Sequence, residues 1–171
     1  NARQYRYRDA WEQMSILRES IRVKGAQPVE VALAFTRHGP VIWSDTRRAY
    51  ALRSAWLEPG TAAYFGSASY GAAKNYEEFR AGIERSLAPG LNYVYADVKG
   101  NIGWVAGGLA PVRPNWDGLL PVPGDGRYEW AAFWRGDQLP SVLNPPEGYI
   151  ATANEMNLPK GYPHEQRKLG F

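Results

Sequence analysis

Glycine and proline are so frequent in this chain that they constrain its fold more than any other feature. The 171 residues include 18 Gly and 13 Pro, well above the roughly 12% that is average for the two together. They also include 7 Trp, 11 Tyr and 5 Phe. Because aromatic side chains suit a half-buried pleated surface and Gly and Pro end strands, this combination predicts short strands joined by many turns. It does not favour a bundle of long helices.

The length and composition indicate one domain over residues 1–171, with 44% hydrophobic residues available for a core. The absence of cysteine excludes disulfides, thiol catalysis and cysteine-based metal sites. No apolar run approaches the roughly 20 residues of a membrane span, and the chain has no basic start followed by an apolar stretch, so it contains no signal peptide. The formal net charge of +3 is small, and we expect neither nucleic acid nor a membrane as a partner.

Hydrophobic periodicity predicts two hairpins and one clear helix. Apolar and other residues alternate in two runs on either side of a turn, and the same pattern recurs further along. The predicted strands are residues 5–8, 21–24 and 29–35, a strand after Gly39-Pro40, and residues 93–98 and 102–106. The predicted helices are residues 75–88, with a capping box of Asn75 and Glu78, and less clearly 61–73. The fold class is therefore α+β, mostly antiparallel hairpins with one or two helices.

In the second half of the chain the sequence predicts mainly turns, which surround the predicted hairpins and helices. Residues 111–146 are rich in Pro, Gly and Trp, which excludes central strands and predicts a long structured excursion. Residues 148–154 alternate weakly and predict a last short strand.

Local patterns of reactive side chains do not identify a catalytic site. The two histidines, His38 and His164, lack the ligand spacing of a metal site. A Ser–His–Asp catalytic triad stays a possible interpretation, because a triad is recognised by its geometry and not by the order of its residues in the sequence. No serine, however, has the flanking glycines of a nucleophile elbow. The tryptophans fit a core or an open stacking platform for a sugar or nucleic acid. Asn154, at the end of the last predicted strand, fits a turn cap or an oxyanion donor.

Two acidic pairs could be described as paired carboxylates, and each has a simpler explanation. Glu77 and Glu78 lie in the first turn of the predicted helix, where the helix dipole favours acidic side chains. Asp125 and Glu129 flank an aromatic hairpin. We therefore do not predict glycosidase chemistry.

A series of short motifs resembles the penicillin acylase (penicillin amidase) family. The order and spacing agree over nearly the whole chain, and such a series is far more specific than any one motif. The motifs are TRHGPVI (36–42), YALR (50–53), EPG (58–60), NYEEF (75–79), NYVYAD (92–97), GNIG (100–103), DGLLPVPG (117–124), YEW (128–130), NPP (144–146) and GYIATAN (148–154).

The resemblance implies part of the four-layer αββα fold of the N-terminal-nucleophile hydrolases. In that family an exported precursor cuts itself into α and β chains, and the hydroxyl of the first β-chain serine attacks an amide, with its own α-amino group as the base. Residues 1–171 are then expected to be an internal piece of the β chain. The expected partners are the remaining parts of both chains and a small N-acyl substrate, and the expected location is periplasmic or secreted.

The resemblance also assigns roles to individual residues. Asn154 matches the oxyanion-hole asparagine, and Leu91 matches an apolar position that lines the acyl pocket. No cofactor is expected to be required, and calcium binds in the complete enzyme of some relatives. Weak calcium candidates are the Gly118 carbonyl and Glu165, which is adjacent to the matched but non-acidic Gln166.

Asn1 departs from the family pattern, because a carboxamide cannot replace an activated serine. We therefore expect the 171 residues alone to be inactive, and we expect self-association through uncovered sheet edges. The alternative is a non-catalytic, aromatic-rich β module that binds a sugar or peptide, since residues 97–104 resemble a turn of a β-propeller blade. A propeller would repeat that pattern every 40–45 residues or so, and it occurs once here.

Overall fold

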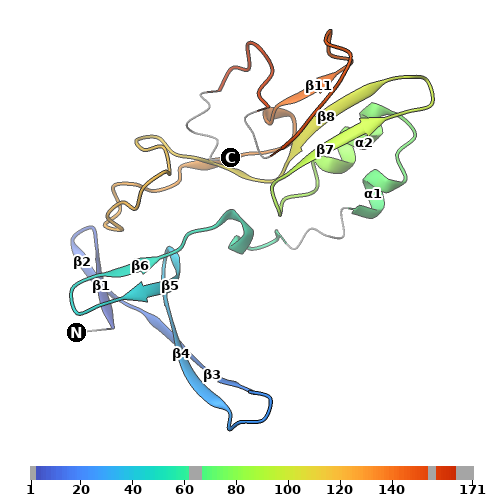
Figure 1. Cartoon of the computed structure of the whole chain (residues 1–171). Coiled ribbons are helices and arrows are strands. Elements are labelled where there is room, and N and C mark those ends of the chain that lie inside the picture. Colours follow the sequence, from blue (N-terminus) through green and yellow to red (C-terminus); the bar gives the residue numbers. More distant parts are fainter. Residues whose placement is uncertain (1–2, 62–66, 154–156, 165–171) are drawn as a thin grey trace. The chain divides into compact units, whose positions relative to one another are not determined.

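The computed structural model describes residues 3–61, 67–153 and 157–164. Its residues form two compact units, one from residues 1–57 and 121–128 and the other from residues 58–120 and 129–171. Antiparallel sheets dominate both, and the described helices lie in the second unit apart from one short 3-10 turn, so the expected α+β class is confirmed (Figure 1). That residues 1–171 fold as one domain stays a prediction.

The first unit consists of antiparallel strands. A two-stranded sheet pairs β1 with β2, and a four-stranded sheet has the order β3-β4-β5-β6. The bounds are β1 Gln4–Tyr7, β2 Ala10–Gln13, β3 Ser15–Ile21, β4 Val29–Thr36, β5 Gly39–Ser44, β6 Ala49–Ala51 and the 3-10 turn η1 Ala55–Leu57. The short strand predicted over residues 5–8 and the strand predicted after Gly39-Pro40 are therefore confirmed.

The first strand of the β3–β4 hairpin lies earlier in the chain than the sequence pattern predicts. We expected residues 21–24 to pair with residues 29–35, whereas β3 ends at Ile21, which is the partner of Val29. Proline has no N–H to donate to a ladder, so pairing begins after Pro28 and the chain between the two strands becomes the connection. Gly25, with φ of +77°, lies in this connection.

One face of the β3–β4 hairpin is exposed and mostly apolar, with Glu19 as its charged member opposite Val31. Leu17 lies opposite Leu33 and Ile21 opposite Val29, and all four side chains are exposed. Side chains alternate between the two faces, so the register pairs Arg18 with Ala32 and Ser20 with Glu30 on the other face. A two-stranded ribbon of this kind is marginally stable by itself, and its apolar face is a surface that another polypeptide can cover.

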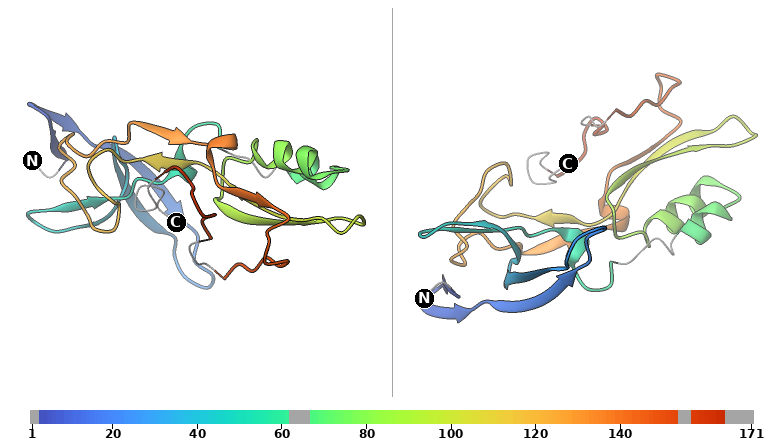
Figure 2. Two further views of the ribbon diagram at one scale, coloured as in Figure 1. Left: turned by 90° about the horizontal axis from the view of Figure 1, so that it is seen from above. Right: turned by 60° about the horizontal axis from the view of Figure 1, so that its bottom comes forward.

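The second unit contains the helices and the remaining strands. The elements are α1 Ser67–Gly71, α2 Tyr76–Ile83, β7 Leu91–Ala96, β8 Ile102–Gly107, β9 Ala110–Val112, β10 Ala132–Trp134, the 3-10 turn η3 Gly136–Gln138 and β11 Ser141–Leu143. A three-stranded sheet has the order β11-β8-β7, and β9 pairs with β10. Figure 2 shows α2 beside the β7–β8 hairpin. The predicted hairpin of residues 93–98 and 102–106 is confirmed.

Helix α2 begins where the sequence predicts and ends earlier. The Asn75 side chain accepts a hydrogen bond from the Glu78 backbone N–H at 2.8 Å, which confirms the N-cap. The reciprocal bond of a capping box differs, because the Glu78 carboxylate accepts from the Lys74 backbone N–H at 3.0 Å and from the Asn75 side chain at 3.0 Å. The helix ends at Ile83, not at residue 88, because a tighter turn follows in which the Ser86 N–H donates to the Ile83 carbonyl at 2.8 Å. Pro89 contributes to this ending, since it disfavours helical geometry in the residue before it.

The remaining sequence predictions are only partly correct. Of the helix expected over residues 61–73, the described part is helical only at Ser67–Gly71. The strand expected over residues 148–154 is wrong for residues 148–153, which contain a bend and no strand. There the Gly148 N–H donates to the Pro145 carbonyl at 3.0 Å and Gly148 has φ of +75°, so the chain turns where a strand would pair. Within residues 111–146, β11 is a short edge strand.

None of the helices in the described part of the chain has both the length and the apolar character needed to cross a membrane.

Candidate functional site

The β7–β8 hairpin separates two clusters of apolar side chains, one on each face of the three-stranded sheet. On one face Tyr95 and Val105 pack with Tyr76 and Ile83 of α2. On the other face lies the cluster that we call the Trp104 cluster, formed by buried Trp104, Ala106, Ala110 and Leu139. The register of β7 and β8 explains this division, because Tyr93 lies opposite Val105 and Val94 opposite Trp104.

The segment that carries Asn154 begins and ends at the Trp104 cluster. Asn154 itself lies outside the described residues. The described chain on either side is anchored, because Ile150 and Leu158 both pack against this cluster. The two described flanks of the predicted oxyanion residue therefore pack against the same apolar cluster.

Leu91 is the first residue of β7 and its side chain is 47% exposed. Leu91 is paired with Gly107 of β8. Its side chain lies on the same face of β7 as those of Tyr93 and Tyr95, which pack toward α2. The Trp104 cluster lies on the opposite face. The Leu91 side chain therefore lies on the face opposite the Trp104 cluster, and its acyl-pocket role stays a prediction.

A hydrogen bond that the sequence analysis missed joins β7 to the Trp104 cluster. The Trp104 indole N–H donates to the Asn92 side-chain oxygen at 2.8 Å. Trp104 is only 4% exposed, so its N–H needs a partner within the protein. The signal was present in the sequence, since extending the predicted hairpin pairs residue 92 with 106 and places its side chain beside Trp104 on the same face.

The turn of the same hairpin is held by Asp97. Its carboxylate accepts hydrogen bonds from the Asn101 side chain at 2.8 Å, from the backbone N–H groups of Asn101 and Lys99 at 2.9 Å each, and from the Tyr95 hydroxyl at 3.0 Å. The Asn101 side chain is the largest cause, and together these donors lower the pKa of Asp97 from 3.8 to about 2. Asn144, just after β11, donates to Asn101 at 2.9 Å, so the turn is tied to the third strand.

We expect Asp97→Asn to destabilise the chain at neutral pH and to have little effect near pH 2. Because the folded pKa lies below the ordinary 3.8, the ionised form stabilises the fold above that value, and this contribution disappears as the pH falls toward 2. Urea unfolding of the wild-type chain and of Asp97→Asn at several pH values measures the difference in the free energy of unfolding. Asp9→Asn, at an exposed position, is the control. A stability difference that is the same at pH 2 and pH 7 would contradict this interpretation.

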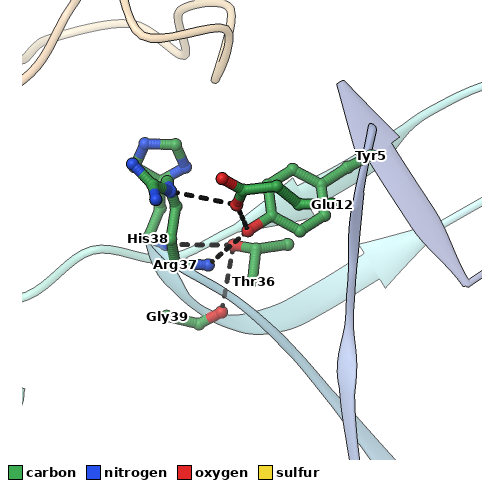
Figure 3. Close-up of polar contacts among 6 residues, drawn as sticks. All are labelled: Tyr5, Glu12, Thr36, Arg37, His38 and Gly39. Carbon is green, nitrogen blue, oxygen red and sulfur yellow. Dashed lines mark hydrogen bonds and ion pairs between the residues drawn. The ribbon is translucent and has the colours of Figure 1, made fainter. Parts of the chain in front are cut away.

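The turn between β4 and β5 contains the first family-like motif, and its contacts are structural (Figure 3). The Glu12 carboxylate accepts from the Tyr5 hydroxyl at 2.6 Å and from Arg37 Nε at 3.0 Å. The Arg37 backbone N–H donates to the Tyr5 hydroxyl at 3.0 Å, and the Arg37 guanidinium lies 3.6 Å from the centre of the Tyr7 ring. These contacts join the β1–β2 hairpin to the turn, and the Tyr5 hydrogen bond is the main cause that lowers the pKa of Glu12.

Both histidines have structural surroundings. The His38 backbone N–H donates to the Thr36 hydroxyl at 3.2 Å, so His38 takes part in the turn between β4 and β5. The His164 ring stacks on Trp134 at 4.6 Å and meets Tyr162 edge-on at 5.3 Å. No group of three or more His, Cys, Asp or Glu side chains in the described ranges could hold a metal ion.

The surroundings of Gly118 do not fit calcium. A Cβ placed on Gly118 would lie 2.8 Å from Cζ of Arg113, whose side chain is buried and whose pKa burial lowers. Calcium requires several oxygen ligands, whereas the nearest side chain here is a cation. Asp117 accepts a hydrogen bond from the Leu119 N–H at 3.0 Å, and Glu165 lies outside the described residues. We therefore assign no step to calcium.

A cavity of about 400 Å³ lies beside the end of α2 and contains none of the predicted site residues. It is lined by Glu84, Arg85, Leu87, Arg135, Gly136, Asp137 and Gln138.

Comparison with known proteins relates the whole chain to one family. The family model described as penicillin amidase matches residues 1–170. An acyl-homoserine lactone acylase QuiP of Pseudomonas fluorescens is 35% identical over 171 residues, which cover 95% of this chain and 21% of that protein. A penicillin G acylase of Escherichia coli is 36% identical over 163 residues, covering 93% of this chain and 19% of that protein.

A solved structure extends the similarity to three dimensions. The thermostable penicillin G acylase from Alcaligenes faecalis matches with a TM-score of 0.85 and 32% sequence identity, over 94% of this chain and 29% of that chain. The chain therefore spans about a fifth of the length of these curated relatives and under a third of the solved chain.

Proposed function

The chain belongs to the penicillin amidase family, and from that premise we propose that it is part of an amide hydrolase that removes the acyl group from a penicillin or a related N-acyl compound. The observation that carries this proposal is the similarity of fold and sequence to a penicillin G acylase over 94% of the chain. Such a match covers both β-sheet units and the segments between them.

Within that enzyme, we propose that Asn154 donates its side-chain N–H to the oxyanion of the tetrahedral intermediate. A serine hydroxyl outside these 171 residues would attack the amide carbon, and negative charge would develop on the former carbonyl oxygen. A fixed amide dipole stabilises that charge more than it stabilises the neutral substrate. The anchoring of Ile150 and Leu158 on the Trp104 cluster supports the proposal, because an oxyanion donor must be held in position before the reaction.

Leu91 is proposed to contact the acyl group. Its exposed side chain at the start of β7 offers apolar surface without a polar atom, which suits an acyl chain. The relatives named above act on different acyl compounds by their printed names, penicillin G in one case and acyl-homoserine lactones in the other. Assays of the complete enzyme with penicillin G and with N-acyl-homoserine lactones decide between these substrates.

The remaining parts of the two acylase chains are the proposed partners. The exposed apolar face of the β3–β4 hairpin, formed by Leu17, Ile21, Val29 and Leu33, supports this, since the relatives supply about four times as much polypeptide outside the matched region. Export to the periplasm or the medium is proposed from the family resemblance, and fractionation of cells that produce the complete protein tests it.

The purified 171-residue chain is expected to hydrolyse no amide and to self-associate. In that polypeptide the free α-amino group is on Asn1, whose carboxamide is not a nucleophile, and the apolar side chains of the β3–β4 hairpin are exposed. Release of amine from penicillin G and from N-acyl-homoserine lactones measures the first expectation, and sedimentation at several concentrations measures the second. Measurable hydrolysis that Asn154→Ala abolishes, or a monomer at every concentration, would contradict them.

The non-catalytic β-module reading is less well supported. The propeller-like turn at residues 97–104 is the β7–β8 turn held by Asp97. Within the described ranges its sheet has three strands, whereas a propeller blade has four. The family match over residues 1–170 favours the acylase.

A further inference from the structure

The chain contains two Asp–Gly pairs, at residues 117–118 and 125–126, and the two share one local geometry. In each pair a carboxylate oxygen of the aspartate accepts from the backbone N–H two residues on, at 3.0 Å from Leu119 and at 3.2 Å from Arg127. The two glycines both have a positive φ, of +84° and +95°. The sequence and the turn are therefore matched, and a difference in reactivity between the pairs has to come from their surroundings.

The surroundings of Asp125 hold it at two points. Its carboxylate accepts from Nε of Arg127 at 2.8 Å and pairs with Nη2 of the same guanidinium at 2.7 Å. Its backbone carbonyl accepts from the Arg8 N–H at 2.8 Å. Gly126 packs closely on Tyr7, since a Cβ placed on it would lie 3.1 Å from Cε2 of that ring. A rotation of the Asp125–Gly126 peptide would therefore break or strain several contacts.

Asp117 is much less constrained. Asp117 and Gly118 are both exposed, and the next two residues, Leu119 and Leu120, are 80% and 75% exposed. Within the described ranges the Asp117 carboxylate forms no ion pair and its backbone carbonyl accepts no hydrogen bond, although Arg113 acts on it through its charge. Few contacts therefore oppose a rotation of the Asp117–Gly118 peptide.

We propose that Asp117 is a site of spontaneous covalent modification, at which the Asp117–Gly118 linkage converts to isoaspartate through a succinimide, whereas Asp125 is protected. The proposal depends on neither the acylase activity nor the proposed role of any other residue. Glycine suits the reaction because it has no Cβ to hinder its nitrogen. The product has one extra carbon atom in the main chain at residue 117.

The reaction needs only water besides the chain itself. The Gly118 nitrogen attacks the carbon of the protonated Asp117 side-chain carboxyl, so that a C–N bond forms and the carboxyl C–OH bond breaks. The hydroxyl leaves as water with the amide proton, and a succinimide ring remains. Water then adds to either ring carbonyl and breaks one of the two C–N bonds. One route restores aspartate, and the other leaves the main chain running through the side-chain carbon.

The protection of Asp125 follows from the same chemistry. The carboxyl reacts in its neutral form, whereas the hydrogen bond from the Arg127 side chain is the largest cause that lowers the pKa of Asp125 and favours the ionised form. Ring closure also moves the carboxyl carbon toward Gly126 and away from the guanidinium. Losing a hydrogen bond to a charged group costs about a factor of ten or more, so we expect Asp125 to react at least about tenfold more slowly than Asp117 in the folded protein.

Incubation of the complete acylase that contains this chain, in water enriched in heavy oxygen, measures both rates. Each passage through the succinimide adds one heavy oxygen, and mass spectrometry of chromatographically separated peptides assigns it to residue 117 or 125 and distinguishes aspartate from isoaspartate. The same protein unfolded in urea at the same pH and temperature is the control. There the two rates should agree within about threefold, because the contacts of the folded state are lost.

Three variants test the assignment in the folded protein. Arg127→Gln should raise the rate at Asp125 at least about threefold, because the charged partner is lost, and leave the rate at Asp117 unchanged as an internal reference. Arg22→Gln, at another exposed arginine of the same unit, is the matched control and should change neither rate. Asp117→Glu should abolish the label at residue 117, since its longer side chain cannot close the same ring.

Four results would overturn the proposal. The first is equal labelling of the two sites in the folded protein, or faster labelling of Asp125. The second is an unlabelled Asp117 in the folded protein that is labelled in urea, since the loop is then held by contacts of the complete enzyme. The third is a ratio of rates that is the same in urea as in the folded protein. The fourth is an Arg127→Gln variant that keeps the wild-type circular dichroism and Tm without faster labelling of Asp125; if this variant does not fold, the wild-type comparison with urea decides by itself.

Discussion

Replacing Asn154 by alanine in the complete acylase is expected to lower kcat by about 10² to 10³-fold, the usual loss when one oxyanion donor is removed. KM should change little, because the hydrogen bond strengthens as charge develops on the oxygen. Asn154→Asp should be at least as slow, since a carboxylate of the same shape cannot donate and repels the oxyanion. Steady-state hydrolysis of a chromogenic N-acyl amide measures both.

Thr152→Ala is the control for Asn154. It changes an exposed side chain in the same anchored segment, and we expect kcat to stay within about twofold of wild type. The oxyanion role would be refuted if Asn154→Ala retained more than about a third of the wild-type kcat. It would also be refuted if Asn154→Asp were fully active, because the side chain would then not be needed as a donor.

Gly39→Ala is expected to destabilise the first unit by about 3 kcal/mol or more. Gly39 has φ of +121°, and a Cβ placed on it would lie 2.2 Å from the Leu52 carbonyl oxygen. The neighbouring backbone cannot easily retreat, because the Leu52 N–H donates to the Pro40 carbonyl at 2.9 Å. Urea unfolding of the 171-residue chain, followed by far-ultraviolet circular dichroism, measures the change in the free energy of unfolding.

Gly25→Ala separates the backbone strain from the steric overlap. Gly25 also has a positive φ, of +77°, yet a Cβ there would have nothing within 4 Å, so only a conformational cost of about 1–2 kcal/mol is expected. If the two variants are equally stable, the close approach between Gly39 and Leu52 does not control the stability of this unit.

Features that depend on a few neighbouring residues could be predicted from the sequence. The β7–β8 hairpin follows from alternation around Gly100, and the start of α2 from Asn75 and Glu78. The β3–β4 register was misjudged because the alternation continues through residues 22–24, whereas Pro28 sets where pairing begins. The predicted strand at residues 148–153 failed because nothing in the sequence indicates whether a partner strand lies beside it.

The site was harder to predict because it depends on contacts between distant residues. The local pattern of Asn154 fits a turn cap as well as an oxyanion donor, and only the family resemblance favours the oxyanion role. Asn92 could have been found by extending the hairpin register. The buried Arg113 beside Gly118 could not, since a loop conformation brings the two together and no periodicity in the sequence encodes it.

The common anchoring of Ile150 and Leu158 has a consequence for how this region can change in evolution. Because both ends of the intervening segment are tethered to one surface, its closure entropy depends only weakly on its length, and doubling the number of residues would add only about 0.6 kcal/mol. Insertions between Ile150 and Leu158 would therefore cost little folding free energy and yet would shift Asn154, the proposed oxyanion donor, relative to its flanks. If that proposal holds, selection on the number of residues between the two anchors would come from turnover and not from stability.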